Sequence, residues 1–446
     1  MTASFPRPRA IIGTFFHAPT PDAVEVLEDV LIRIDETGVF TDIIPPGSRD
    51  ESDALRLPHG TYGLPGMVDL HIHAPQYPQL GLALDEPLEV WLQKYTFPLE
   101  AKFADPAFAR PRFEMLVSDL LANGTTTGLY FATQDAGASK LLADICIAKG
   151  QRALVGKVVM DDPAACPDYY RDASAEAAVE DTRAVIAHIR NHPENAGARV
   201  LPVVTPRFIP SCTDEALQGL GALAAECGCH VQSHVSESDW AHGHVLARYG
   251  HTDTEALERF GLLTRKTVLA HGGHLTGDDM ARIAGRGAGV AHCPISNSYF
   301  GNAVFPLRQA MEKGVHVGLG TDISGGPILT MFEAMRGAVQ VSRMLQDGVE
   351  PQQPAEIRGR AGAAIDLATA FHCATAGGGE ALDLPIGKIA VGYKADLIAI
   401  DTAAPEGGVR LFGETDQMLI LQKILYTATR ANIAAVYVDG AQVAGK

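Results

Sequence analysis

The sequence predicts an α/β protein, a (β/α)₈ TIM-like barrel with a small β-sandwich domain formed by the N- and C-terminal segments. Residues 65–384 alternate eight short apolar runs with helix-like segments, which is the pattern of parallel βα units. Both ends of the chain carry strand-like runs instead. The first central run ends in His-Ile-His, where a doubly wound sheet would usually carry a glycine-rich phosphate turn. These observations favour a barrel closed on itself.

The terminal segments, residues 1–64 and 385–446, read as short strands separated by turn residues. The N-terminal segment contains AIIGTFF, VLEDVLIRID and GVFTDIIP, and the C-terminal segment contains PIGKIAVGYKADLIAID and IAAVYVDG. Neither segment is long enough to hold a core alone. We therefore expect them to pair into one small β domain, with residues 65–384 inserted as the catalytic barrel.

The central segment supplies one expected barrel strand per apolar run. Amphipathic stretches such as PAFARPRFEMLVSDLLANG and TDEALQGLGALAAECG separate most of the runs. In chain order the runs are GMVDLHIH, TTTGLYFA, LVGKVVMD, RVLPVVTP, CHVQSHV, TVLAHG, GVAHCP and VHVGLGTD. The carboxyl ends of barrel strands meet at one face, where barrel active sites lie. Residues that end these runs are therefore the candidates for chemistry.

Composition and charge exclude several classes of protein. The 446 residues are 46% hydrophobic, which is too apolar for a disordered chain. The net charge of −17 offers no basic footprint for nucleic acid. No apolar window of about 18 residues predicts a membrane span. Seven cysteines without a tight pattern, and an N-terminus without a signal-peptide run, favour reduced thiols and a cytoplasmic location.

Two histidines end the first expected barrel strand. His71 and His73 are two residues apart, so they project from the same face of a strand. Two imidazoles on one face suit a borderline metal such as zinc. Taken alone, the pair also fits two buried histidines that are merely hydrogen-bonded.

Three further runs end in residues able to bind a metal. His234 ends the fifth run and Glu237 follows it closely, His271 ends the sixth, and Asp322 ends the eighth. A lone aspartate after a strand is more often a helix cap than a ligand. The joint occurrence outweighs that reading, because all these strand ends converge at one face. Three histidines, one aspartate and an open water position make a catalytic metal site.

The set His-x-His, His-x-x-Glu, His and Asp resembles the metal-dependent amidohydrolase superfamily and, within it, the guanine deaminase family. Four stretches carry the closer resemblance: LPGMVDLHIHAPQYPQLG, EVWLQKYTFPLE, VVTPRFIPSCT and HCPISNSYFGNAVFPL. The resemblance covers nearly the whole chain. It implies a zinc-containing (β/α)₈ barrel, hydrolysis of guanine to xanthine and ammonia in purine catabolism, and a homodimer.

The number of metal ions is a separate question, because some relatives hold two metals bridged by a carbamylated lysine on the fourth barrel strand. The fourth run, RVLPVVTPRF, contains no lysine. Lys157, in the third run, is the nearest candidate and lies on the wrong strand. We therefore expect one Zn²⁺ per subunit.

The mechanism that follows is a hypothesis in which each converging residue has a role. His71, His73, His234 and Asp322 hold the metal, which lowers the pKa of its water to about 7. Glu237 moves the proton of that water to N3 of the purine while C2 is attacked. His271 stabilises developing negative charge, and Asp322 also orients the water and assists departure of ammonia.

Recognition of the base is assigned to side chains at the same mouth. Gln76 offers a donor and an acceptor, and the fork of Arg207 suits O6 and N7 of guanine. Phe208 would pack on the ring, and Trp91 would belong to a segment that roofs the pocket. His234 and Glu237 also touch the substrate in this hypothesis. The plainer alternatives are a rim salt bridge for Arg207, core packing for Phe208 and a packed helix face for Trp91.

Two other functions fit parts of the sequence. An aminohydrolase of the same superfamily that acts on another purine, a pterin or an s-triazine would share the metal site. A non-catalytic scaffold on the same barrel would have lost ligands or the acid–base residue, and none is lost here. The pocket residues Gln76, Arg207 and Phe208 favour guanine.

Overall fold

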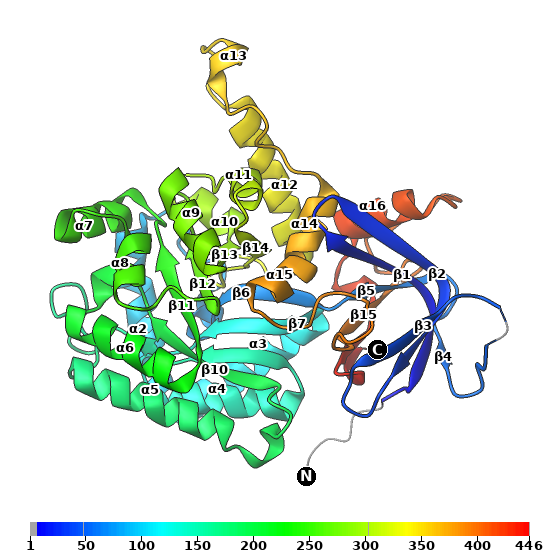
Figure 1. Ribbon diagram of the computed structural model, residues 1–446, viewed down its shortest axis with the longest axis horizontal. Coiled ribbons are helices and arrows are strands. Elements are labelled where there is room, and N and C mark those ends of the chain that lie inside the picture. The colour runs from blue at the N-terminus through cyan, green and yellow to red at the C-terminus, as the bar shows by residue number, and fades with distance from the viewer. Residues whose placement is uncertain (1–6, 48, 302, 446) are drawn as a thin grey trace.

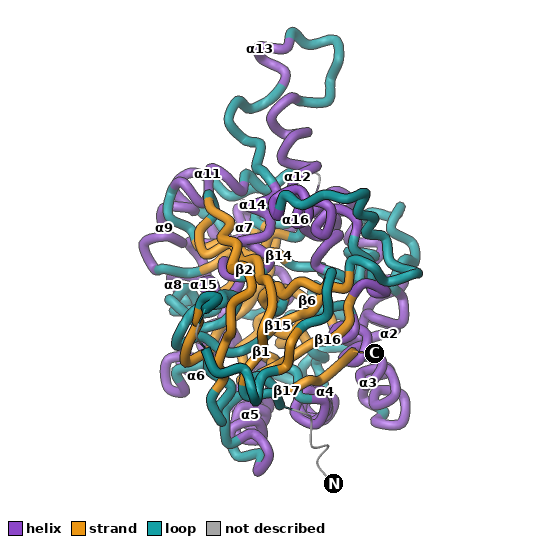
Figure 2. The backbone as a smooth tube through the Cα atoms, turned by 90° about the vertical axis from the view of Figure 1, so that its right-hand side faces the viewer, coloured by secondary structure: helices purple, strands orange, loops and turns teal. Residues whose placement is uncertain are grey.

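The computed structural model describes residues 7–47, 49–301 and 303–445. It consists of a helix-covered barrel and a smaller mixed sheet beside it, built from the two ends of the chain (Figure 1). A helical hairpin that includes α12 and α13 projects away from the rest of the molecule (Figures 1 and 2). The predicted fold class is confirmed.

All eight predicted runs form barrel strands. They pair in parallel in chain order, and a two-residue strand, β9 (Val158–Val159), adds to one of them. Their side chains are almost all buried, because helices cover the outside and packed side chains fill the inside. The strands are β6 (Met67–His73), β7 (Thr125–Phe131), β8 (Arg152–Gly156), β10 (Val200–Pro206), β11 (His230–Val235), β12 (Thr267–His271), β13 (Gly289–His292) and β14 (His316–Leu319).

The seam between the first and last barrel strands is closed by residues just after β14. The backbone N–H of His73 donates to the carbonyl of Ile323 at 2.9 Å, and the N–H of Asp322 donates to the carbonyl of His71 at 2.9 Å. The barrel is therefore nearly closed, with β6 and the end of β14 held together by a short patch of bonds at the carboxyl-end face.

Helices begin and end where local chemistry favours it. Asp105, Asp135, Ser174, Thr213 and Ser238 each cap a helix by accepting a bond from a first-turn N–H. The helices are α1 (Leu88–Trp91), α2 (Phe97–Glu100), α3 (Pro106–Ala122), α4 (Ala136–Lys149), α5 (Ala175–Arg190), α6 (Asp214–Cys227), α7 (Asp239–Tyr249), α8 (Asp253–Arg259), α9 (Gly277–Arg286), α10 (Pro294–Ser296), α11 (Leu307–Glu312), α12 (Met331–Asp347), α13 (Ala355–Arg358), α14 (Leu367–Ala374), α15 (Ala376–Ala381) and α16 (Gln417–Thr427).

The two ends of the chain join in one small β domain, as the sequence predicts. Its order is β17-β16-β15-β5-β1-β2-β3, with β4 beside β1, so the strands form one continuous mixed sheet rather than two separate ones. The strands are β1 (Ala10–Thr20), β2 (Ala23–Ile34), β3 (Phe40–Ile44), β4 (Leu55–Arg56), β5 (Thr61–Pro65), β15 (Leu397–Asp401), β16 (Ile433–Val438) and β17 (Ala441–Gly445). We propose domain boundaries after residues 64 and 384.

A buried ion network joins the sheet to the barrel. Arg152, at the start of β8, donates to Asp396 from Nε at 2.8 Å and from Nη2 at 3.1 Å, and also bonds Asp439. The side chain of Arg152 is 8% exposed and that of Asp396 is 1% exposed. Removing one partner of such a network leaves buried charge without compensation, which is strongly destabilising.

We expect Arg152→Met to lower the free energy of unfolding by about 3–5 kcal/mol, measured by urea denaturation. The matched control is Arg183→Met, which removes a bidentate pair with Glu226 on the surface, where the two side chains are 40% and 58% exposed. The control should cost less than about 1 kcal/mol. Equal losses in the two variants would contradict a stabilising role for the buried network.

Within the described ranges, no helix is long and apolar enough to cross a membrane.

Candidate active site

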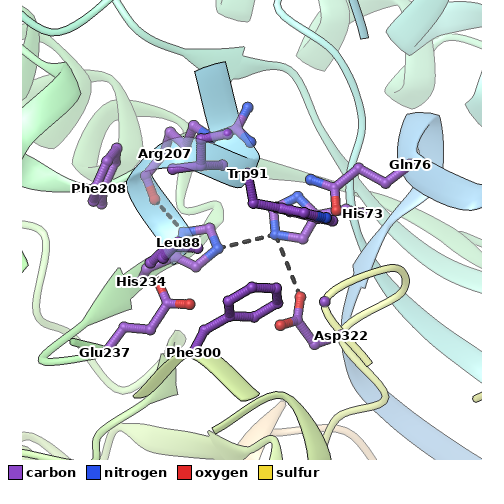
Figure 3. A pocket seen from close by; sticks show the side chains of 12 residues that line it. His73, Gln76, Leu88, Trp91, Arg207, Phe208, His234, Glu237, Phe300 and Asp322 are labelled. Carbon is purple, nitrogen blue, oxygen red and sulfur yellow. Dashed lines mark hydrogen bonds and ion pairs between the residues drawn. The ribbon is translucent and has the colours of Figure 1, made fainter. Parts of the chain in front are cut away.

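The residues predicted to form the site converge at the carboxyl-end face of the barrel. His71 and His73 come from β6, His234 from the end of β11 and His271 from the last position of β12. Asp322 follows β14 and bonds the backbone of His71 across the seam. Figure 3 shows His73, His234 and Asp322 directed at one another. The structure thus brings the strand-end residues together, as their positions in the sequence predict.

Ring nitrogens and a carboxylate meet at the centre of this group. The Nε2 atoms of His73 and His234 are 2.9 Å apart (Figure 3). The Oδ1 atom of Asp322 lies 3.2 Å from Nε2 of His71 and 3.6 Å from Nε2 of His73. His71, His73 and His234 are close enough for one nitrogen of each to bind the same ion.

These donors fit a divalent metal on chemical grounds. Neither ring nitrogen of His71 has a hydrogen-bond partner among the described residues, although the side chain is fully buried. His234 donates from Nδ1 to the carbonyl of Arg207 at 2.5 Å, which turns the lone pair of Nε2 toward the centre. Burial lowers the pKa values of His71, His73 and His234 well below 6.5. The imidazoles are therefore neutral, which is their metal-binding form.

His271 and Glu237 lie at the edge of the metal-binding group. His271 donates from Nδ1 to Oδ1 of Asn297 at 2.9 Å, and its Nε2 is 3.6 Å from Oε1 of Glu237 and 4.0 Å from Oδ2 of Asp322. Burial, and then the charge of Asp322, raises the pKa of Glu237 to about 8. A carboxyl group with a pKa near neutrality is suited to both accepting and donating a proton.

Several site residues depend on unusual backbone conformations. The φ angles of Ser236, His271 and Asp322 are 46°, 78° and 52°, in the left-handed region that non-glycine residues rarely adopt. Ser236 is held there by the buried Asp253, which accepts from its N–H at 2.5 Å and from its hydroxyl at 2.7 Å. These two hydrogen bonds fix the backbone at Ser236 and therefore the direction in which the side chain of the next residue, Glu237, projects.

Asp69 supports the same site from the middle of β6. Its carboxylate accepts from the N–H of His71 at 3.2 Å, and from the N–H and hydroxyl of Thr321 at 3.0 and 2.6 Å. It therefore ties the first barrel strand to the residue before Asp322, again across the seam. Full burial raises the pKa of Asp69 to about 7.

A pocket opens to solvent beside these groups, and its wall combines metal-binding side chains with apolar and aromatic ones. Its roof is the segment containing α1, a π-helical turn (Leu92–Thr96) and α2. Apolar side chains provide most of the exposed lining. The lining residues are His73, Gln76, Leu88, Trp91, Leu92, Arg207, Phe208, His234, Glu237, Phe300, Asp322 and Gly325.

The predicted substrate-binding residues all line this pocket. Arg207 does form a salt bridge, but the bridge is buried in the pocket wall rather than at the rim. Phe208 is 7% exposed and lies over His234 and Trp240. Trp91 donates from its indole to the carbonyl of Leu82 at 3.0 Å and packs against Phe300. Trp91 therefore both packs against its neighbours, as the alternative interpretation expects, and lines the pocket.

Sequence reasoning missed five residues of the site. Leu88, Leu92, Phe300 and Gly325 line the pocket, and Glu100 binds Arg207 and Gln76 from behind it. A signal for Glu100 was present, since it is the single carboxylate that ends the aromatic stretch WLQKYTFPLE. The others are apolar or small residues, three of them in short helical segments and Gly325 in a turn, and no residue pattern distinguishes them from ordinary packing.

Lys157, the nearest candidate for a bridging carbamate, is engaged elsewhere. It is fully buried between β8 and β9, where its ammonium pairs with Asp172. Asp172 also accepts from the N–H of Met160 at 2.9 Å.

Comparison with known proteins places these features in a family. The model of the amidohydrolase family matches residues 62–443. Human guanine deaminase is 36% identical over 452 residues, which cover 97% of this chain and 95% of the human one. The crystal structure of guanine deaminase from C. acetobutylicum with guanine bound in its active site has a TM-score of 0.88 and 29% identity, with 97% and 99% of the two chains covered. An adenosine deaminase from Xanthomonas campestris with bound zinc has a TM-score of 0.79 and 25% identity, with 98% and 93% covered.

Proposed function

The chain belongs to the amidohydrolase family and, within it, to the guanine deaminases, and on this basis we propose that it hydrolyses guanine to xanthine and ammonia. Water replaces the 2-amino group, so guanine and one water molecule yield xanthine and one ammonia. The observation that carries the proposal is the pocket itself. Histidines that could hold a metal, the Glu237 carboxylate and the Arg207 side chain lie around one cavity, and this arrangement supports the proposal.

We propose that His71, His73, His234 and Asp322 hold one Zn²⁺ per chain. Unpartnered ring nitrogens, neutral imidazoles and the bound zinc of the Xanthomonas adenosine deaminase support this assignment. When bound, the metal supplies a water acidified to a pKa of about 7. The engagement of Lys157 with Asp172 supports a single ion, since that amine is unavailable for a bridging carbamate.

Proton movement is assigned to Glu237, and charge stabilisation to His271. Glu237 accepts a proton from the attacking water and delivers it to N3 of the purine as C2 becomes tetrahedral. His271 faces both carboxylates through Nε2, so it stabilises the negative charge that develops between them. Asp322 accepts a hydrogen bond from the water and assists proton delivery to the departing ammonia.

The purine is held by the pocket wall opposite the acid–base residues. In the view of Figure 3, Arg207 and Gln76 lie on one side of the pocket, and Glu237 and Asp322 lie on the other. Arg207 meets the O6 and N7 edge, Gln76 adds an amide, and Phe208 and Trp91 contact the ring faces. His234 and Glu237 complete the contacts. A homodimer and a role in purine catabolism remain predictions from the family resemblance, and a cytoplasmic location remains a prediction from the cysteines and the N-terminal sequence.

A substrate panel tests this function. The purified protein is expected to convert guanine to xanthine at least about 100-fold more efficiently than it deaminates adenine, because buried donors that suit O6 are left unmatched by a 6-amino group. Ultraviolet absorbance follows each reaction for guanine, adenine, a pterin and an s-triazine. A chelator should stop turnover, and added Zn²⁺ should restore it. If the protein prefers the pterin or the triazine, guanine is not its substrate and the proposed function is wrong.

A further inference from the structure

We infer that Glu100 is a specificity-determining positioning residue, because it selects which edge of the Arg207 guanidinium is offered to the purine. The inference rests on the proposed function and adds a residue to it. Glu100 ends α2, at the back of the pocket roof, and is 1% exposed. It is not among the residues that line the pocket, so it acts through its neighbours.

Glu100 binds both predicted recognition side chains with one carboxylate. Its Oε2 accepts from Nη1 of Arg207 at 2.7 Å, and its Oε1 accepts from Nη2 of Arg207 at 3.1 Å. The same Oε1 accepts from Nε2 of Gln76 at 2.8 Å. A bidentate pair of this kind fixes direction as well as distance. The centroid of the Phe97 ring lies 5.0 Å from the guanidinium carbon, so the ring packs against the group.

The donors of Arg207 can be counted one by one. A guanidinium has five N–H groups. Glu100 takes one from each terminal nitrogen, and the sulfur of Met160 lies 3.9 Å from Nη1 and takes its second. No acceptor among the described residues bonds Nε–H or the second N–H of Nη2. The free donors are thus two adjacent, parallel N–H groups on one edge.

The Gln76 amide is oriented by the same contacts. Its NH₂ group donates to Glu100, and its oxygen accepts from the N–H of Ser324 at 3.1 Å. These two partners therefore determine which end of the Gln76 amide is the NH₂ group and which is the oxygen. Within the described part of the chain, Glu100 is the one acceptor bonded to this NH₂ group, so the second N–H remains for a ligand beside the carboxylate that holds Arg207.

Two parallel donors match the O6 and N7 acceptors of guanine, the pair that arginine also binds in DNA grooves. A 6-amino group presents a donor instead of O6, and an unsubstituted C6 presents nothing. Rotation of the guanidinium would move these two N–H groups out of line with the O6 and N7 acceptors. The carboxylate of Glu100 prevents that rotation, so the discrimination at C6 depends on a residue that does not touch the purine.

The experiment compares two ligands that lack the 2-amino group and so cannot be deaminated there. Hypoxanthine carries O6 and N7, whereas purine lacks O6. In the wild-type zinc-loaded protein, calorimetry should give tighter binding of hypoxanthine. In Glu100→Gln, which keeps the size but loses the bidentate pair, the ratio of the two dissociation constants should fall about 10- to 100-fold. For guanine turnover, KM should rise more than kcat falls.

Two further variants make the result decisive. Glu89→Gln removes an exposed carboxylate from the same roof segment and should leave the ratio unchanged. If Glu100→Gln does not fold, Glu100→Asp keeps the charge but withdraws it by one methylene, and it should show a smaller fall in the same ratio. A ratio that stays at the wild-type value in the folded Glu100 variant overturns the inference. Failure of the wild-type protein to deaminate guanine would instead overturn the proposed function.

Discussion

Glu237→Gln should lower kcat for guanine by about 100- to 10,000-fold while the metal content stays at the wild-type level. Glutamine has the shape of glutamate but cannot accept a proton from the attacking water. The side chain of Glu237 lies 3.6 Å from His271 and is not needed to fill the proposed ligand set. Steady-state kinetics and metal analysis of the same preparation measure the two quantities.

The matched control for this variant is Asp239→Asn. Asp239 lies two residues further along the chain, at the start of α7, and its side chain is 78% exposed. It should retain activity within a few-fold of the wild-type value, because surface substitutions of this kind act weakly. If Glu237→Gln keeps more than about a tenth of the wild-type kcat, the proton shuttle must use another group.

His234→Gln should lose both the bound metal and more than about a thousand-fold of the activity, since the metal contributes several kcal/mol of transition-state stabilisation. The control is His230→Gln on the same strand. His230 sits at the opposite end of β11, where its Nε2 donates to the carbonyl of Leu382 at 2.7 Å. This variant should keep the metal and the activity and lose about 1 kcal/mol of unfolding free energy.

Zinc titration of the metal-free proteins compares these two variants directly. Full zinc occupancy in His234→Gln, with dissociation as slow as in the wild-type protein, would remove His234 from the ligand set. Loss of zinc from His230→Gln would show that general destabilisation, rather than ligand removal, releases the metal. Comparing the two variants therefore separates the loss of a metal ligand from a general destabilisation of β11.

The convergence of the metal-binding side chains could be predicted because it depends only on strand order and polarity. His71, His73, His234 and His271 each end a continuous apolar run, and parallel strands in a barrel bring such ends to one face. The position of Asp322 was harder to predict, because this residue lies beyond β14 and has a left-handed backbone conformation. Its position followed from the joint occurrence of the strand-end residues rather than from its own surroundings.

The pocket wall was predicted less completely. Arg207 and Gln76 line the pocket, but the partner that orients them, Glu100, comes from a segment that mixes α-helical and π-helical turns. Periodicity cannot place a side chain in such a segment, because its residues per turn change along its length. The left-handed turn at Ser236 and its clamp by Asp253 likewise depend on tertiary contacts that no local pattern encodes.

The seam that closes the barrel sets an order of events during synthesis. His71 and Asp322 are 251 residues apart in the chain, yet they bond one another across that seam. At translation rates of about 5–20 residues per second, roughly 10–50 s pass between the emergence of the two residues from the ribosome. A nascent chain that ends before Asp322 therefore lacks one of the four proposed metal ligands. The reactive centre can arise only after the first 322 of the 446 residues have been made, so the protein is inactive until its last barrel strand has been synthesised.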